Sequence, residues 1–181
     1  ARMIKRGHPD CKVVFVGPCD SKKLEARRES VRSDVDFVLT FEEALGLCGR
    51  ALEIDPDFLF PRASTLDLFH TDAERLLARG ASPARAIARG LAAAEAVEKT
   101  SPDWRWLPFW RATLHRVQAE HDLLSGADPG PVLARAESAL AKLAQDRESF
   151  DDADAAEGEI ATVTAETLFA RASTKARRAR E

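Results

Sequence analysis

The part of the sequence best suited to chemistry is a cysteine with two lysines close behind it. Cys19 follows an apolar run at residues 13–16 and a Gly-Pro turn, and Lys22 and Lys23 come shortly after it. A thiolate is a ligand for iron, and a nearby ammonium group lowers the pKa of a thiol. We therefore take Cys19 as a candidate metal ligand, and Cys19 with Lys22 and Lys23 as a candidate cofactor-binding group.

The other cysteines do not complete a recognisable ligand set. Cys11 and Cys48 share no repeated spacing with Cys19, so the three cysteines do not form a recognisable set of metal ligands. An inert thiol and no bound cofactor is therefore the favoured interpretation. No serine–histidine–aspartate spacing, phosphate-binding loop or dinucleotide fingerprint is present, which favours a protein that is not an enzyme.

A second group of candidate residues is aromatic. Trp104, Trp106 and Trp110 stand close together with Phe109, and residues four apart, such as Trp106 and Trp110, share one face of a helix. Packing between neighbouring helices explains such a cluster, and a groove that binds a peptide is the functional alternative. The three tryptophans are our candidate partner-binding residues.

Composition places the chain among ordinary globular proteins. It has 181 residues, of which 45% are hydrophobic and 31% charged, and its formal net charge is −3. That charge gives no reason to expect nucleic acid as a partner, and no apolar run approaches the roughly 20 residues that span a bilayer. An odd number of cysteines without a visible secretion signal predicts reduced thiols and a cytoplasmic location.

The elements that would position Cys19 form a small α/β segment. Residues 12–16 are β-branched and aromatic and predict a strand, residues 20–30 suit a helix, and residues 34–40 predict a second strand. A strand, a helix and a strand over so short a stretch make a βαβ unit. Such a unit is too small to bury both faces of a parallel strand pair by itself.

The rest of the chain predicts helices that recur with a fixed period. A Pro-Asp pair at residues 56–57 returns at 102–103, and a Gly-Ala-x-Pro turn at residues 80–83 returns at 126–129, both offset by 46 residues. Between these breaks, apolar residues repeat on one helical face. A helical hairpin repeated at a fixed period predicts an α-solenoid.

We therefore predict a mainly α fold, with a period of about 46 residues in the α-solenoid and a small βαβ fragment at the N-terminus. Alanine is nearly absent from the first forty residues and abundant afterwards, which indicates two segments. The predicted limits are 1–43 for the α/β fragment, 44–175 for the helical repeats and 176–181 for a basic tail.

Two motifs in the first segment carry a family resemblance. Gly-Pro-Cys-x-x-Lys-Lys, which contains Cys19, Lys22 and Lys23, and Val-Leu-Thr-Phe-Glu-Glu, at residues 38–43, resemble the C-terminal region of the iron-only hydrogenase large subunit over about residues 1–45. The resemblance implies that Cys19 ligates an iron–sulfur cluster and that the neighbouring lysine stabilises its anionic ligands. The motifs that supply the other cysteines in that family are absent from this sequence.

The helical segment resembles a different family. Ala-Leu-Glu-Ile-Asp-Pro at residues 51–56 looks like a junction between tetratricopeptide repeats, and residues 42–173 resemble the long-period tetratricopeptide-like region that follows bacterial serine/threonine kinase domains. The sequence contains no glycine-rich nucleotide loop, His-Arg-Asp or Asp-Phe-Gly motif, so kinase activity is not implied.

Together these patterns favour a non-catalytic protein–protein interaction module built from tetratricopeptide-like repeats, a regulatory part of a kinase-type protein. Its partner would be a protein or peptide held on a concave surface near residues 57–79 and 104–124, and an uncapped end would also allow self-association. Neither nucleic acid nor a membrane is expected as a partner. The alternative is an iron–sulfur redox protein, or a fragment of one, with Cys19 as a ligand.

Overall fold

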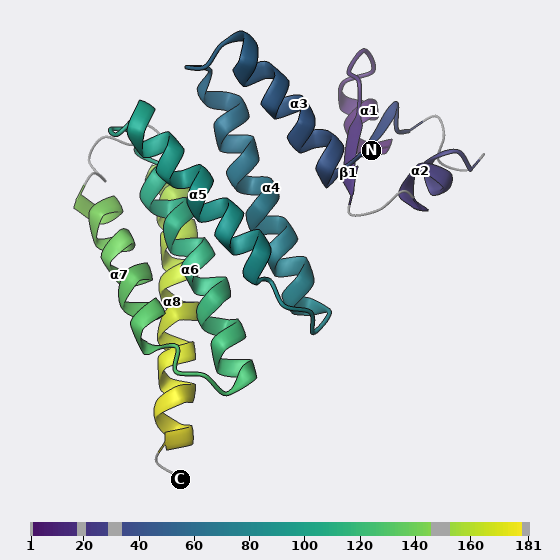
Figure 1. Ribbon diagram of the computed structural model, residues 1–181. Coiled ribbons are helices and arrows are strands. Elements are labelled where there is room, and N and C mark those ends of the chain that lie inside the picture. The colour runs from purple at the N-terminus through teal and green to yellow at the C-terminus, as the bar shows by residue number, and fades with distance from the viewer. Residues whose placement is uncertain (1, 18–20, 29–33, 146–152, 179–181) are drawn as a thin grey trace. The chain divides into compact units, whose positions relative to one another are not determined.

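The computed structural model describes residues 2–17, 21–28, 34–145 and 153–178 (Figure 1). The chain divides into two compact units, Ala1–Pro61 and Arg62–Glu181. The expectation of a mainly α fold with a small N-terminal sheet is confirmed. An assembly of the hairpins into a tetratricopeptide-like solenoid is not confirmed. The domain limits expected from sequence describe changes of composition, and they stay predictions.

The first unit contains a parallel strand pair with short helices around it. Its elements are α1 (Arg2–Gly7), β1 (Val14–Gly17), α2 (Ser21–Ala26), β2 (Phe37–Thr40) and α3 (Phe41–Ile54). The two strands pair in parallel, from Val14 opposite Phe37 to Gly17 opposite Thr40. Strand, helix and strand follow one another as the sequence predicts.

The strand pair has little apolar cover. Val14, Phe15 and Val16 of β1 are 37–48% exposed, and Phe37 of β2 is 58% exposed. Parallel strands normally bury both faces. The exposure agrees with the expectation that this unit is too small to bury the pair by itself.

The Thr-Phe-Glu-Glu motif ends β2 and begins α3. The Thr40 hydroxyl accepts a hydrogen bond from the Glu43 backbone N–H at 3.2 Å, and the Glu43 carboxylate accepts one from the Thr40 N–H at 2.8 Å. This reciprocal capping box satisfies two backbone donors that a helix start leaves without partners. The motif therefore has a structural role whatever its function.

The second unit is a helical bundle made of two hairpins and a final long helix. Its helices are α4 (Leu59–Ala78), α5 (Ala84–Thr100), α6 (Leu107–Ser125), α7 (Gly130–Gln145) and α8 (Ala153–Arg178), of which α4 begins just before the boundary between the units. The two glycine turns predicted from the repeat join α4 to α5 and α6 to α7 (Figure 1). Both glycines are left-handed, with φ of +69° at Gly80 and +85° at Gly126.

Each helix that follows a glycine turn starts after the proline of that turn, with α5 at Ala84 and α7 at Gly130. An N-cap at Ser82 or Asp128 would have started the helix one residue earlier. Pro83 is the N-cap of α5. Ser82 still accepts a hydrogen bond from the Ala84 N–H at 3.4 Å, and Asp128 accepts one from the Gly130 N–H at 2.9 Å. The two turns therefore use the same device at equivalent positions of the repeat.

The core of the second unit is centred on α6. Leu114, Val117 and Ala119 of this helix have no exposed surface, and α6 packs against α5, α7 and α8. A Cβ at Gly90 of α5 would lie 2.9 Å from the Leu114 side chain, so the glycine allows a close approach of the two helices. Among the described helices, none is both long and apolar enough to cross a lipid bilayer.

Candidate binding sites

The lysines of the N-terminal motif are engaged by carboxylates. Lys22 Nζ lies 2.6 Å from Glu25 Oε2, within α2, and Lys23 Nζ lies 2.6 Å from Glu43 Oε1, at the start of α3. Lys22 lowers the pKa of Glu25, and Lys23, followed by the Thr40 backbone, lowers the pKa of Glu43. Lys23 therefore ties α2 to the capping box of α3.

The candidate ligand itself lies outside the described residues. Cys19 falls between β1 and α2, in the stretch at residues 18–20. Cys11 and Cys48 are half-buried free thiols. In the part of the chain that the structure describes, no three histidine, cysteine, aspartate or glutamate side chains come together as a metal site would require. The roles of Cys19, Lys22 and Lys23 as cofactor ligands stay predictions.

The three tryptophans gather around one cavity in the second unit. The cavity has a volume of about 440 Å³ and is lined by Ala63, Asp67, His70, Trp104, Trp106, Phe109 and Trp110. Its walls come from α4 and from the start of α6, the first helix of each hairpin. This is the surface that the sequence predicted for a partner, although a role in binding stays a prediction.

The rings that line this cavity hold one another in place. The ring centroids of Trp106 and Phe109 are 6.0 Å apart, and those of Phe109 and Trp110 are 5.3 Å apart. In both pairs the rings meet edge to face. His70 meets Trp110 in the same way, at 6.1 Å. Each of these side chains is half-buried. The cavity wall is therefore ordered but remains accessible.

The tryptophans differ in how much they contribute to the core. Trp104 and Trp110 pack against a buried cluster that contains Leu66 and Val97. Trp106 is not part of that cluster and contacts the ring of Phe109. Core packing, the alternative that the sequence left open, thus applies to Trp104 and Trp110, whereas Trp106 is the N-cap of α6.

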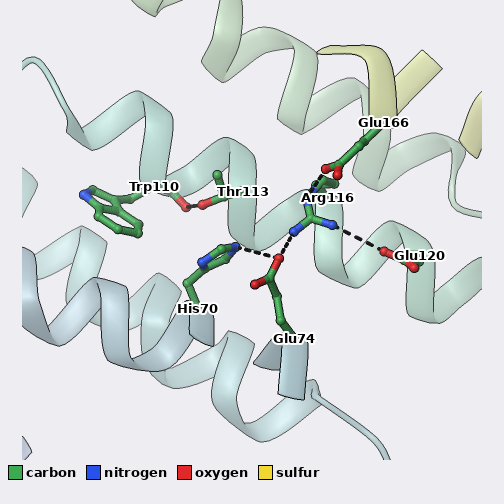
Figure 2. A network of polar contacts seen from close by, with 7 residues as sticks. All are labelled: His70, Glu74, Trp110, Thr113, Arg116, Glu120 and Glu166. Atoms are coloured by element: carbon green, nitrogen blue, oxygen red, sulfur yellow. Dashed lines mark hydrogen bonds and ion pairs between the residues drawn. The ribbon is translucent and has the colours of Figure 1, made fainter. Parts of the chain in front are cut away.

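A polar network begins at His70 and runs along α6 (Figure 2). Arg116 is 12% exposed and forms ion pairs with Glu74 of α4, Glu120 of α6 and Glu166 of α8. Its Nε lies 2.9 Å from Glu166 Oε2, too bent to be a hydrogen bond but close enough for strong attraction. Arg116 therefore links three helices.

His70 is a neutral member of this network. Its Nε2 lies 3.4 Å from Glu74 Oε1. Burial lowers the pKa of His70 below its usual value, and Arg116 adds to the lowering, although Glu74 opposes it. His70 therefore lines the aromatic cavity as a neutral imidazole.

Sequence reasoning missed Asp67 and His70 as cavity residues. A signal was present, because residues 63, 67 and 70 share one face of the predicted helix at residues 57–79. That signal does not say which face of the helix meets the tryptophans, since this depends on how α4 packs against α6. Glu166 carries no such signal at all, because its contact with Arg116 joins residues far apart in the sequence.

A family model described as the iron only hydrogenase large subunit, C-terminal domain, matches residues 1–101. No curated protein and no solved structure matches the chain. The tetratricopeptide-like kinase region, which the sequence suggested for residues 42–173, receives no support.

The matched region is longer than the sequence analysis predicted. It was expected to end near residue 45, yet it continues through α3, α4 and α5 and covers more than half of the 181 residues. The change of composition near that position is therefore not a family boundary. The chain belongs to the family of the iron only hydrogenase large subunit, C-terminal domain.

Proposed function

We propose that the helical unit, residues 62–181, is a non-catalytic interaction module that holds a partner peptide in the tryptophan cavity. The observation that carries this proposal is the cavity itself, because every tryptophan of the chain lines it. Its volume of about 440 Å³ lies in the range of small ligand sites. It would hold one large apolar side chain of a partner together with its neighbours.

Preorganisation supports this role. Aromatic side chains offer a large contact area at a small cost in conformational entropy, and the edge-to-face contacts among Trp106, Phe109 and Trp110 already fix their rings. Less entropy is then lost when a ligand binds. Aromatic residues in partly desolvated pockets are also the ones that dominate binding energy at protein interfaces.

The charge at the cavity suggests the composition of the peptide. Asp67 is exposed beside the aromatic rings. A carboxylate near tryptophan faces attracts a cationic side chain through both charge and the ring quadrupole. We therefore expect a partner segment with a large apolar residue next to a lysine or arginine. An odd number of cysteines is compatible with a reducing, cytoplasmic setting for such a module.

The test uses intrinsic fluorescence, which reports on the cavity because the chain has three tryptophans and no tyrosine. Random twelve-residue peptides displayed on phage are selected on the full chain, and the enriched peptide is titrated while tryptophan emission is followed. We expect saturable binding that Trp106→Ala weakens by about tenfold or more, the scale of a hot-spot residue.

Phe169→Ala is the matched control. Phe169 is a 74% exposed aromatic residue on α8 and does not line the cavity, so its removal should leave binding unchanged. The proposal fails if no peptide is enriched on the chain over the Trp106→Ala variant. It also fails if Phe169→Ala weakens binding as much as Trp106→Ala does.

The family match favours a second candidate function, a contribution to an iron–sulfur centre with Cys19 as a ligand. The residues of this chain do not fit a complete cluster, because a cubane takes about four thiolates and the chain has three cysteines. The described lysines of the motif are also already paired with carboxylates. The chain would therefore supply one ligand to a centre completed by other residues.

This candidate is tested by anaerobic purification, addition of iron and sulfide, and measurement of bound iron with the visible spectrum. Stoichiometric iron that is lost in Cys19→Ala and kept in Cys48→Ala would establish the second candidate. Bound iron that is unaffected by Cys19→Ala, or no bound iron at all, would exclude Cys19 as a ligand in this chain.

A further inference from the structure

A second cavity, of about 640 Å³, lies in the helical unit and is lined by α5, α6, α7 and the turn before α6. Trp104 lines this cavity as well as the aromatic one. Its other walls are mainly charged rather than aromatic. Nothing in the proposed function uses it.

Cationic side chains reach this cavity from two neighbouring helices. Arg135, Ser138 and Lys142 are spaced so that they share one face of α7, and Arg111 and His115 share one face of α6. The two helices are held together by a small apolar cluster containing Ala112 and Ala139. The cationic faces therefore meet at a fixed separation set by close packing.

The side chains have different degrees of freedom to bind a ligand. Arg111 is fixed by Glu98, which accepts hydrogen bonds from its two terminal nitrogens at 3.1 and 2.7 Å. Arg135 and Lys142 are exposed and form no ion pair with any described residue. The cavity thus combines one preorganised guanidinium with two exposed cations that form no ion pair with a described residue.

The cavity carries a charge opposite to that of the chain. It is lined by four cations, Arg105, Arg111, Arg135 and Lys142, and by two carboxylates, Glu98 and Asp103. The lining is therefore net +2, in a chain whose net charge is −3. Like charges gathered in a concave site repel one another, and a bound anion relieves that repulsion.

His115 is a buried residue in the wall of this cavity. Its side chain lines the cavity, the residue is 9% exposed, and Nδ1 has no hydrogen-bond partner among the described groups. Burial, with Arg135 and Arg111 in support, lowers the pKa of His115 to about 4. The imidazole is therefore neutral near pH 7, because a further positive charge is disfavoured there.

We propose that this cavity is an oxyanion-binding site, in which Arg111, Arg135 and Lys142 bind a phosphate or carboxylate group of a small ligand. Guanidinium groups bind both kinds of oxyanion through paired, charge-assisted hydrogen bonds. The Ser138 hydroxyl is a further donor on the same face of α7. The site stands on its own observations and does not depend on peptide binding in the tryptophan cavity.

The test is isothermal titration of the full chain with pyrophosphate and, separately, with the tricarboxylate tricarballylate, both at low ionic strength. Arg135→Gln/Lys142→Gln removes the two cations that form no ion pair with a described residue, and their exposure means that the fold does not depend on them. We expect saturable binding of one or both probes, reduced by about tenfold or more in the double variant and weakened by added salt.

Arg85→Gln/Lys175→Gln is the matched control, since it removes the same two charges from exposed positions outside the cavity. The affinity of this control variant for the probes should remain within about twofold of the wild-type affinity. Binding of pyrophosphate alone identifies a phosphate ligand, and binding of tricarballylate alone identifies a carboxylate ligand. The proposal is overturned if neither probe binds, or if the control loses as much affinity as the cavity variant.

A second readout places the anion beside His115. A bound anion offsets the positive charge of Arg135 and Arg111, so it should raise the pKa of the His115 ring. Nuclear magnetic resonance of the histidine side chains, with and without the bound probe, measures this pKa. An unchanged His115 titration at saturating probe would contradict binding in this cavity.

Discussion

The two units of this chain differ in how well they bury their apolar residues. Among the described residues, eleven large apolar side chains of the first unit are exposed, against three in the second. The apolar core of the described residues includes one side chain from the first unit, that of Ala44. The motif that carried the family resemblance in the sequence thus lies in the unit with the thinner core, and both cavities lie in the other.

This difference separates the N-terminal motif from the proposed binding sites, while the family match itself extends into the second unit, through residue 101. The family motif consists of a few residues around a turn. A short strand and the start of a helix are enough to hold these residues. A cavity of defined shape depends on packed walls, because interiors at close-packed density hold side chains in fixed rotamers. The second unit supplies such walls through α6, so we place the proposed binding functions there.

The largest predicted effect concerns the core of the second unit. Leu114→Ala removes a side chain with no exposed surface, so we expect the free energy of unfolding to fall by about 2–5 kcal/mol. Leu24→Ala is the matched change in the first unit, where the side chain is 67% exposed, and should change it by less than about 0.5 kcal/mol. Urea denaturation followed by circular dichroism measures both. A loss of similar size in the two variants would remove the distinction between the units.

The next effect is the pH dependence of the second unit. The pKa of His115 is about 4 in the folded chain and about 6.5 when unfolded, so the folded state binds fewer protons between these values. Stability from this group is therefore present above about pH 6.5 and lost as the pH falls towards 4. The loss is on the order of 2–3 kcal/mol between pH 7 and 4.5.

His115→Gln isolates this contribution from that of the carboxylates, which also lose stability on acidification. Urea denaturation at the two pH values should show a smaller loss of stability in His115→Gln than in the wild type. An equal loss in both proteins would mean that the folded His115 has an ordinary pKa.

A smaller effect distinguishes two ion pairs between helices. Arg116 is 12% exposed and links three helices, whereas Arg171 is 54% exposed and, among the described residues, pairs with Glu137. Because a desolvated charge network is worth more than a solvated pair, Arg116→Met should cost about 1–2 kcal/mol of unfolding free energy and Arg171→Met less than about 0.5 kcal/mol. Thermal denaturation of the two variants gives the comparison. Equal shifts would show that burial does not strengthen the Arg116 network.

The smallest effect lies in the first unit. Thr40→Ala removes the hydroxyl that caps α3 and should destabilise that helix by about 1 kcal/mol or less. Thr40→Ser keeps the cap and should have little effect. Amide hydrogen exchange of residues in α3 reports the change directly, and unaltered exchange in Thr40→Ala would mean that the capping box contributes no stability.

Much of the helical architecture could be predicted from local chemistry. Gly80 and Gly126 are left-handed because glycine carries no Cβ penalty there, and the prolines that follow stand immediately before the first residues of α5 and α7. The βαβ order also follows from short β-branched runs beside Gly-Pro. These features are decided by residues that are adjacent in the sequence, so they can be predicted from the sequence alone.

The features that the sequence left open depend on contacts between distant residues. Whether α4 turns Asp67 towards the tryptophans, or whether Arg135 faces Arg111, is decided by helix packing. The tetratricopeptide interpretation remains unconfirmed for a related reason. A 46-residue repeat of turns describes helical hairpins in general, and an Ala-rich composition does not show where one family ends, as the match through residue 101 demonstrates.

Amide hydrogen exchange over the full chain tests the central claim most directly, since it measures local opening in every element under one condition. We predict that the amides of α6 exchange at least about a hundredfold more slowly than those of β1 and β2, because α6 is the centre of a packed core and the strand pair is poorly covered. Equal protection of α6 and the two strands would contradict the account and would place the N-terminal motif in a unit as well packed as the helical one.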